Sequence, residues 1–456
     1  MGVVRSLARG CYLACLIFTI NLTGCQSLSR YESRLSDVSE ALSQGNLEKA
    51  IDAHGYLSSN DDTLLYHLEL GELYWLQGDY EQALRSWLIA NKIVTSWESL
   101  ARLDSSLVIQ DVGSVLINDK IKTYQGYDFE KVMLASRIAL THLMMKDMPS
   151  ARVAIKATHE REAVIENFRN RQRQHLQAEQ TEKNYSLLDF PDYPADTLES
   201  TDISNLRNSY ENALSHYLAG FVYEQLGEPS LAAPGYRKAA ELRPKALDLL
   251  PGAKTLNTRM SRAKVDDSTD LLVIFEHGLA PVKKSIEIAL LIGQGGDATY
   301  VPFSAPAYNA PQVTEDVGLT MRESSLQFSS DVVDIDAMSR RALKDEMPTI
   351  IARGILRSGV KVAMQNAADE LDDSGLMGGL IGLAGVVTEL ADDRSWRLLP
   401  RNIGIARQLI TRGTRTLELR SGSRSHSLEV LVTGRFMLLF VRQVGSQWYV
   451  NQVSFN

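Results

Sequence analysis

The stretch that decides the fold covers residues 212–244 and reads NALSHYLAGFVYEQLGEPSLAAPGYRKAAELRP. Small and aromatic residues stand in it at offsets 0, 3, 7, 12, 16, 19 and 24, namely Gly220, Tyr223, Gly227, Ala232, Tyr236, Ala239 and Pro244. Small residues at these offsets let two antiparallel helices approach closely, and the aromatic rings fill the space beside them. The stretch therefore predicts a helix-turn-helix pair.

Other parts of the N-terminal half repeat this pattern. One earlier stretch has the same offsets, with Gly71, Tyr74, Gly78, Ala83, Trp87 and Ala90. A degenerate copy precedes it, in which Gly45 corresponds to Gly78, and a weaker copy covers 128–158. The pattern resembles a tetratricopeptide repeat, a helix pair of about 34 residues. We therefore expect residues 25–265 to form a helical-repeat domain, which binds a partner rather than transforms a substrate.

Stacked repeats have a concave face that is lined by the first helix of each pair. Helical spacing places six residues on that face: Leu68, Glu72, Trp75, Tyr217, Phe221 and Gln225. We interpret this face as a partner-binding groove, with Trp75 and Phe221 as its main contacts, because aromatic residues supply much of the energy of interfaces. On this hypothesis, replacing either aromatic by Ala weakens partner capture, while the fold still melts cooperatively. The alternative is that most of these side chains pack against neighbouring helices.

The pattern changes after residue 266. Apolar runs at 271–275, 285–292 and 299–303 predict strands, and 336–368 has a helical pattern. Five later runs, separated by glycine-containing turns, suggest an antiparallel meander: 403–409, 416–419, 427–432, 436–441 and 448–453. We read the Gly-rich stretch 376–390 as buried helices rather than a membrane span, for which it is short.

The predicted fold class is therefore α+β. An N-terminal α-helical tetratricopeptide-like repeat domain precedes a mixed α+β domain with an antiparallel sheet, which covers 266–456.

The densest run of chemical groups, DDRSWR, stands at 392–397. Arg394, Trp396 and Arg397 could form a second surface for a partner or a glycan, because an indole offers a flat apolar face and guanidinium groups offer forked donors. The alternative places Trp396 in the core, with the charges in ordinary salt bridges.

The sequence favours a protein that is not an enzyme and that needs no cofactor or metal. It has no two-histidine zinc helix motif, no GxSxG elbow and no GxxxxGK phosphate loop. Glu276 and His277, at the end of a strand, could serve as an acid and a base near a cleft. A joint role is disfavoured, because adjacent strand residues point to opposite faces. The net charge of -8 argues against general nucleic-acid binding. The cysteines are Cys11, Cys15 and Cys25, so the body of the chain offers no thiolate site.

Positions 1–24 have the features of a secretory signal peptide. Arg5 and Arg9 precede an apolar core that is too short to span a bilayer. The LTGC sequence at 22–25 resembles a bacterial lipobox, which implies cleavage before Cys25 and lipid on its thiol and amine. The alternative is an ordinary signal peptide that happens to contain a cysteine. The next residues, Gln26 and Ser27, are not acidic, which implies by the same resemblance the inner leaflet of the outer membrane.

Three motifs complete the pattern: YQGYDFE at 124–130, IFEHGLAPV at 274–282 and ADDRSWRLLP at 391–400. With the lipobox and the degenerate repeats, they resemble a family of outer-membrane lipoproteins of Gram-negative bacteria. The resemblance implies a role in envelope assembly and supplies no catalytic residues. We expect a lipid-anchored, periplasm-facing scaffold or adaptor that binds envelope proteins, and a membrane only through Cys25. The alternatives are a glycan-binding or hydrolytic protein that uses the C-terminal domain, and a structural subunit of a secretion or appendage assembly.

Overall fold

The computed structural model describes residues 35–55, 63–103, 124–183, 192–247, 250–262, 267–292, 299–310, 317–322, 328–371 and 391–456. Cys25 and the Gly-rich stretch 376–390 lie outside these residues, so the predictions for them stay predictions. Among the described helices, none combines the length and apolar character needed to cross a membrane.

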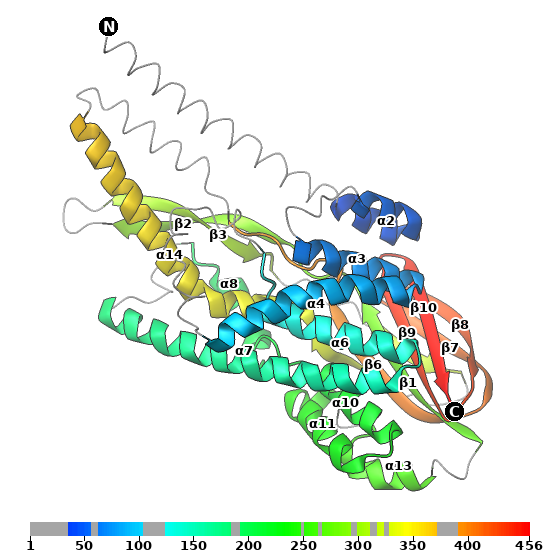
Figure 1. Ribbon diagram of the computed structural model, residues 1–456. Coiled ribbons are helices and arrows are strands. Elements are labelled where there is room, and N and C mark those ends of the chain that lie inside the picture. Colours follow the sequence, from blue (N-terminus) through cyan, green and yellow to red (C-terminus); the bar gives the residue numbers. More distant parts are fainter. Residues whose placement is uncertain are drawn as a thin grey trace.

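The N-terminal half is a layer of antiparallel helix pairs (Figure 1). The helices of this layer are α2 (Leu47–Gly55), α3 (Thr63–Gln77), α4 (Tyr80–Leu103), α6 (Asp128–Met144), α7 (Met148–Lys183), α10 (Ala213–Gln225), α11 (Pro229–Leu242) and α13 (Leu256–Arg262). Short helices connect them: α8 (Ala195–Leu198), α9 (Thr201–Ser204), α12 (Pro244–Leu247) and η4 (Ala253–Thr255). The pairs α3–α4, α6–α7 and α10–α11 correspond to the three best predicted repeats.

Two glycines show why the repeat pattern predicted these pairs. A Cβ atom on Gly71 would lie 2.1 Å from Nε1 of Trp87, and one on Gly220 would lie 2.6 Å from Cδ1 of Tyr236. Only a glycine allows the aromatic ring of the second helix to reach the backbone of the first. The turn between α10 and α11 passes through Gly227 with φ +76°, a left-handed conformation that glycine adopts without strain.

The C-terminal half contains a five-stranded sheet in the order β10-β9-β1-β6-β5. Its strands are β1 (Ser268–His277), β5 (Phe328–Asp334), β6 (Asn402–Thr411), β9 (Phe436–Val444) and β10 (Gln447–Phe455). Neighbouring strands in this sheet pair antiparallel, except that β1 pairs with β9 in parallel. The expected antiparallel meander is thus interrupted, because the first strand of the region inserts between β6 and β9. All but the first residue of β1 are buried, as expected for a strand covered on both faces.

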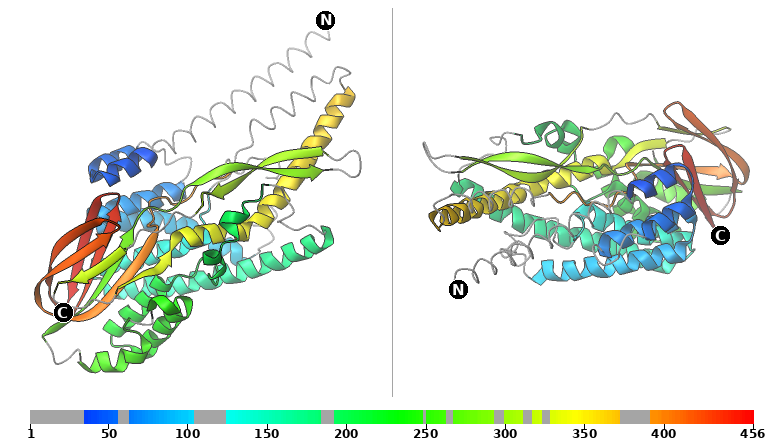
Figure 2. Two further views of the ribbon diagram at one scale, coloured as in Figure 1. Left: turned by 180° about the vertical axis from the view of Figure 1, so that it is seen from behind. Right: turned by 90° about the horizontal axis from the view of Figure 1, so that it is seen from above.

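A three-stranded sheet covers the face of the five-stranded sheet that lies away from the helices. It contains β4 (Val317–Met321), β7 (Gly413–Ser421) and β8 (Arg424–Val432). A separate ribbon of β2 (Lys283–Ile292) and β3 (Thr299–Tyr308) packs along α14 (Ile335–Leu371), as both views in Figure 2 show. The molecule therefore has three layers, with helices, the large sheet and the small sheet in that order.

One hydrophobic core joins the helical layer to the large sheet. It includes Leu68 and Trp75 of α3, Phe221 of α10, Ile274 of β1 and Phe440 of β9. Secondary structure changes from helix to strand near residue 266, as predicted. The two regions nevertheless bury their apolar surfaces against each other, so they share this core.

Candidate functional site

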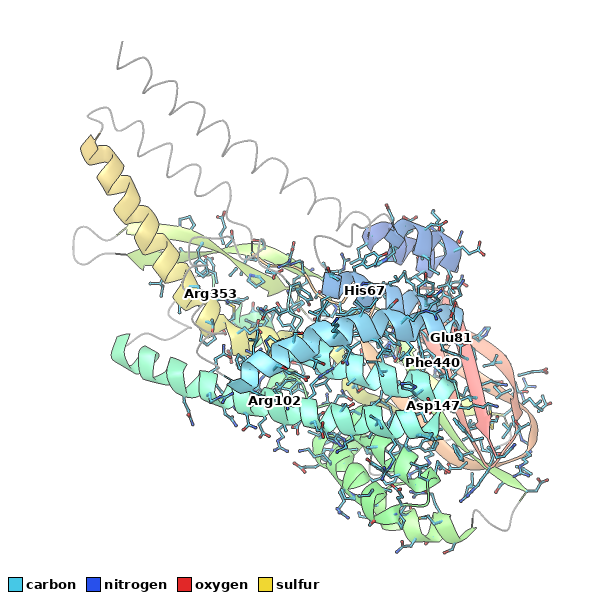
Figure 3. All side chains as sticks on the ribbon, in the orientation of Figure 1. His67, Glu81, Arg102, Asp147, Arg353 and Phe440 are labelled. Carbon is cyan, nitrogen blue, oxygen red and sulfur yellow. The ribbon has the colours of Figure 1, made fainter. Side chains whose placement is uncertain are left out.

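The predicted groove residues lie on the inner face of the helical layer, but the chain's own sheet covers them. Five are almost fully buried: Leu68, Glu72, Trp75, Tyr217 and Phe221. The ring of Trp75 meets Phe440 of β9 edge-on at 5.0 Å, and Phe221 meets Phe436 at 5.9 Å (Phe440 is labelled in Figure 3). The half-buried Gln225 donates to Asp270 of β1 across 3.5 Å.

The structure therefore corrects the prediction of an open groove. Helical spacing identified residues that share one face, but that face is a contact with β1 and β9 rather than a free surface for a second protein. Because each ring fills part of the shared core, we now expect Trp75→Ala and Phe221→Ala to destabilise the fold and not only to affect partner capture.

A buried chain of alternating charges crosses this contact at α3, α6, β1 and β9. Arg137 of α6 donates to Glu72 at 2.7 Å and to Glu276 of β1 at 2.6 Å. Arg442 of β9 donates to the same Glu276 carboxylate at 3.1 Å. Burial alone would lower the pKa of Arg137, but the carboxylates of Glu276 and Glu72 outweigh it and raise that pKa above its ordinary value. Glu276 is therefore held between two arginines and does not act as a free acid beside His277.

A second charged cluster joins α10, α11 and α13 to the sheet. Arg407 of β6 donates to Asp270 of β1 at 2.9 Å and to the hydroxyl of Tyr236 at 2.5 Å. Glu224 lies 3.1 Å from Arg407 and also accepts from Arg259 of α13 at 2.7 Å. Burial would raise the pKa of Glu224, but the two arginines and the Tyr236 hydroxyl lower it. Each acid in the cluster is thus matched by a nearby guanidinium.

The segment 391–400 lies against the inner face as an irregular peptide that turns at 397–398. The backbone N–H of Trp396 donates to Glu130 of α6 at 2.7 Å. The N–H groups of Arg397 and Leu398 donate to the two oxygens of Glu69 at 2.7 and 2.9 Å. Burial raises the pKa of Glu69 to about 8, although these two donors and the Arg397 charge oppose the shift. Two buried carboxylates on neighbouring helix pairs thus hold three consecutive main-chain donors.

The predicted second surface at 392–397 is largely internal. Trp396 is fully buried, as the alternative interpretation had it. Arg394 is buried as well, and its guanidinium donates to both carboxylate oxygens of Asp392, each across 2.9 Å. Arg397 is half-buried. Neither Arg394 nor Trp396 is therefore presented to a glycan or to another protein.

The three motifs at 124–130, 274–282 and 391–400 meet in one place, which we call the motif junction. Glu130 accepts hydrogen bonds from Tyr124 and Trp396, and the N–H of Ala280 donates to the carbonyl of Leu399 at 2.8 Å. The ammonium of Lys283, which directly follows the second motif, donates to the Tyr127 hydroxyl at 2.6 Å and to the carbonyl of Asp392 at 3.1 Å. Burial lowers the pKa of Lys283, against the pull of Asp392 and Glu130.

Sequence reasoning missed Glu69, Glu130 and Arg137, although one signal was visible. α3 reads TLLYHLELGELYWLQ, so its two acids interrupt an otherwise apolar helix. Charged residues are seldom fully buried unless they are paired, and an acid within such a helix indicates an internal partner. The identity of that partner was not visible, because the segment that Glu69 holds comes from near the other end of the chain.

Comparisons with known proteins add little to this geometry. No family model matches the chain, and no curated protein matches it. Among solved structures, a tetratricopeptide repeat protein from Parabacteroides merdae matches with 15% identity and a TM-score of 0.14. The match covers 51% of this chain and 100% of that protein. A likeness at this TM-score carries no argument about function.

Proposed function

We propose that the chain is a lipid-anchored scaffold or adaptor of the cell envelope, held on the periplasmic side of the outer membrane and binding other envelope proteins. The LTGC sequence at 22–25 supports the anchor, and the helical repeats support a protein-binding role. The motif resemblance supports the envelope location.

The capture of 391–400 is the observation that carries the binding role. Here the repeat layer binds an irregular polypeptide segment through Glu69 and Glu130, and that segment belongs to the same chain. Main-chain recognition of this kind suits protein ligands rather than small substrates. Because the inner face is occupied, the partner contacts the outer face of the helices. Ile89 and Leu100, about three helical turns apart on one side of α4, are 45% and 54% exposed there.

A hydrolytic or glycan-binding role around 392–393 has less support. The carboxylate of Asp392 accepts both arms of the Arg394 guanidinium, so it is neutralised within its own segment. A catalytic carboxylate would need to face a substrate instead.

Site-specific photocrosslinking in living cells tests the scaffold proposal. A photoreactive residue at Leu100 is expected to capture one dominant envelope protein. The matched control is Leu431 on β8, which is also 54% exposed but lies in the small sheet. Equal capture from both positions, or none from Leu100, would contradict a partner surface on α4.

Cys25→Ala serves as the anchor control in the same cells. This variant should appear in the soluble periplasmic fraction and lose the Leu100 crosslink if the partner sits in the membrane. If it stays with the membrane, the anchor proposal is wrong.

A further inference from the structure

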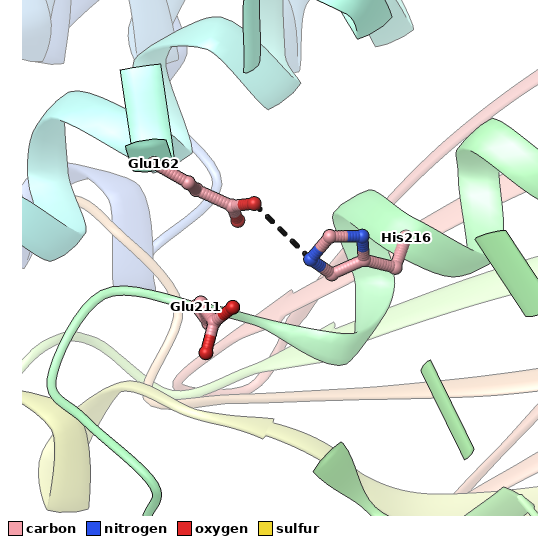
Figure 4. Close-up of side chains that lie close together, drawn as sticks. All are labelled: Glu162, Glu211 and His216. Atoms are coloured by element: carbon pink, nitrogen blue, oxygen red, sulfur yellow. Dashed lines mark ion pairs between the residues drawn. The ribbon is translucent and has the colours of Figure 1, made fainter. Parts of the chain in front are cut away.

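A cluster of metal-ligand side chains joins two neighbouring helix pairs, away from the motif junction. Glu162 lies on α7, Glu211 stands just before α10, and His216 lies in the first turns of α10 (Figure 4). One donor atom from each residue lies within 4.8 Å of the other two. The Nε2 atom of His216 is 3.1 Å from Oε2 of Glu162. None of these residues takes part in the contact between helices and sheet described above.

The cluster contains a buried acceptor that is not satisfied. Glu162 is 6% exposed, and its Oε1 atom has no hydrogen-bond partner. Burial raises the pKa of Glu162, against the pull of His216. A buried carboxylate oxygen without a donor is costly, and such an atom in a native fold calls for a ligand or an ion.

A second histidine beside the cluster also has a buried polar atom that is not satisfied. The ring of His159, one helical turn before Glu162, stacks on His216 with centroids 4.8 Å apart and an angle of 11°. Its Nε2 atom is also buried without a hydrogen-bond partner. A second buried polar atom without a hydrogen-bond partner therefore lies beside the cluster.

The second carboxylate of the cluster, that of Glu211, is held in place by residues outside the cluster. The side chain of Asn208 donates to Oε2 of Glu211 at 2.7 Å, and Lys238 lies 3.1 Å from Oε1. Asn208 is itself fixed, because its Oδ1 accepts from the backbone N–H groups of Tyr210 and Glu211. Metal-binding carboxylates commonly have such supporting hydrogen bonds. Oε2 of Glu211 also lies 3.5 Å from Nε of Arg207, whereas Oε1, which Lys238 contacts, keeps a second lone pair for an ion.

We propose that Glu162, Glu211 and His216 form a binding site for one divalent transition-metal ion of the Zn²⁺ class. Zn²⁺ accepts imidazole nitrogen and carboxylate oxygen at about 2.0–2.2 Å, which places tetrahedral ligands about 3.4 Å apart. The donor atoms lie within 4.8 Å of one another, so the widest pair must close by up to about 1.4 Å around the ion. Three protein ligands leave the fourth position for water. The ion ties α7 of one helix pair to α10 of the next.

Metal binding to the full chain tests this site. The protein is purified in detergent without a histidine tag, stripped with a chelator, and treated with an alkylating reagent, so that a cysteine that keeps a free thiol cannot bind Zn²⁺. Calorimetric titration with Zn²⁺ is expected to give one ion per chain, and a melting curve is expected to shift to higher temperature. Mg²⁺ at the same concentration should do neither, because it prefers all-oxygen sites.

Two variants test whether the ion binds at these residues. Glu162→Gln and Glu211→Gln keep the shape of the side chains and should each weaken Zn²⁺ binding at least tenfold. His426→Gln, on β8, is the matched control and should bind like the parent. Glu211 is only half-buried, so its variant tests the site even if Glu162→Gln does not fold. Failure to bind one Zn²⁺, or equal binding by the control and by a folded Glu211→Gln chain, would overturn the proposal.

Discussion

At the residue scale, buried ion pairs fix how the helices meet the sheet. Arg137 has no exposed surface, and its guanidinium is shared between Glu72 of the helices and Glu276 of the sheet. Such groups contribute little net stability when compared with a well-packed apolar core, but losing one partner leaves a charge buried and alone. They therefore specify one geometry for the contact more than they strengthen it.

Replacing Arg137 tests this role. Arg137→Met keeps a long apolar side chain but leaves Glu72 and Glu276 without their shared cation. The free energy of unfolding should fall by about 3–5 kcal/mol, measured by urea denaturation. Arg85→Met is the control, since Arg85 forms an exposed pair with Glu81 and its loss should cost no more than about 1 kcal/mol. Equal effects of the two changes would show that the buried pairs have no special role.

The same residues show how far sequence reasoning reaches. Spacing along a helix identified Leu68, Glu72 and Trp75 as residues of one face, because that is local geometry. It could not say what covers the face, because Phe440 and Glu276 belong to strands of the distant C-terminal half. An aromatic on a concave repeat face and an aromatic in a core have the same sequence pattern.

At the element scale, the helix pairs could be predicted because their contacts are short-range. Gly71 and Trp87 belong to consecutive helices. A glycine on one helix and an aromatic residue on the next indicate that the two helices approach closely there. The pairing of β1 with β9 joins Leu271 to Met437, and no local feature marks it. The described strands were therefore predicted near their observed positions, except for β4 and β5, which were missed. The order of the strands in the sheet was not predicted.

Gly71→Ala tests the close approach directly. The added methyl would overlap the indole of Trp87, which also donates to the carbonyl of Leu68 at 3.3 Å. We expect a loss of about 1–3 kcal/mol in the free energy of unfolding, despite the better helix propensity of alanine. Gly55→Ala is the control, because a Cβ atom there meets nothing within 4 Å. A Gly71 variant as stable as the Gly55 variant would mean that α3 and α4 can separate without cost.

At the scale of the whole molecule, the helical layer and the large sheet behave as one body. The predicted division at 265–266 marks a change of secondary structure, but the core runs across it. Two charged clusters and the bound segment 391–400 cross the same boundary. The repeat region therefore differs from a free-standing repeat array, whose units contact only their neighbours.

This organisation predicts how a cut chain behaves. A protease site inserted between Arg262 and Asp267, cleaved after folding, should leave two fragments that elute together in gel filtration and unfold in one calorimetric transition. The reason is that separation would expose Trp75, Phe221, Phe436 and Phe440 and would take Arg137 away from Glu276. The helical fragment expressed alone should bind a hydrophobic dye strongly, and the sheet fragment added to it should suppress that binding. Two fragments that elute apart and melt separately would instead restore the division into independent domains, with the inner face of the repeats open to a partner.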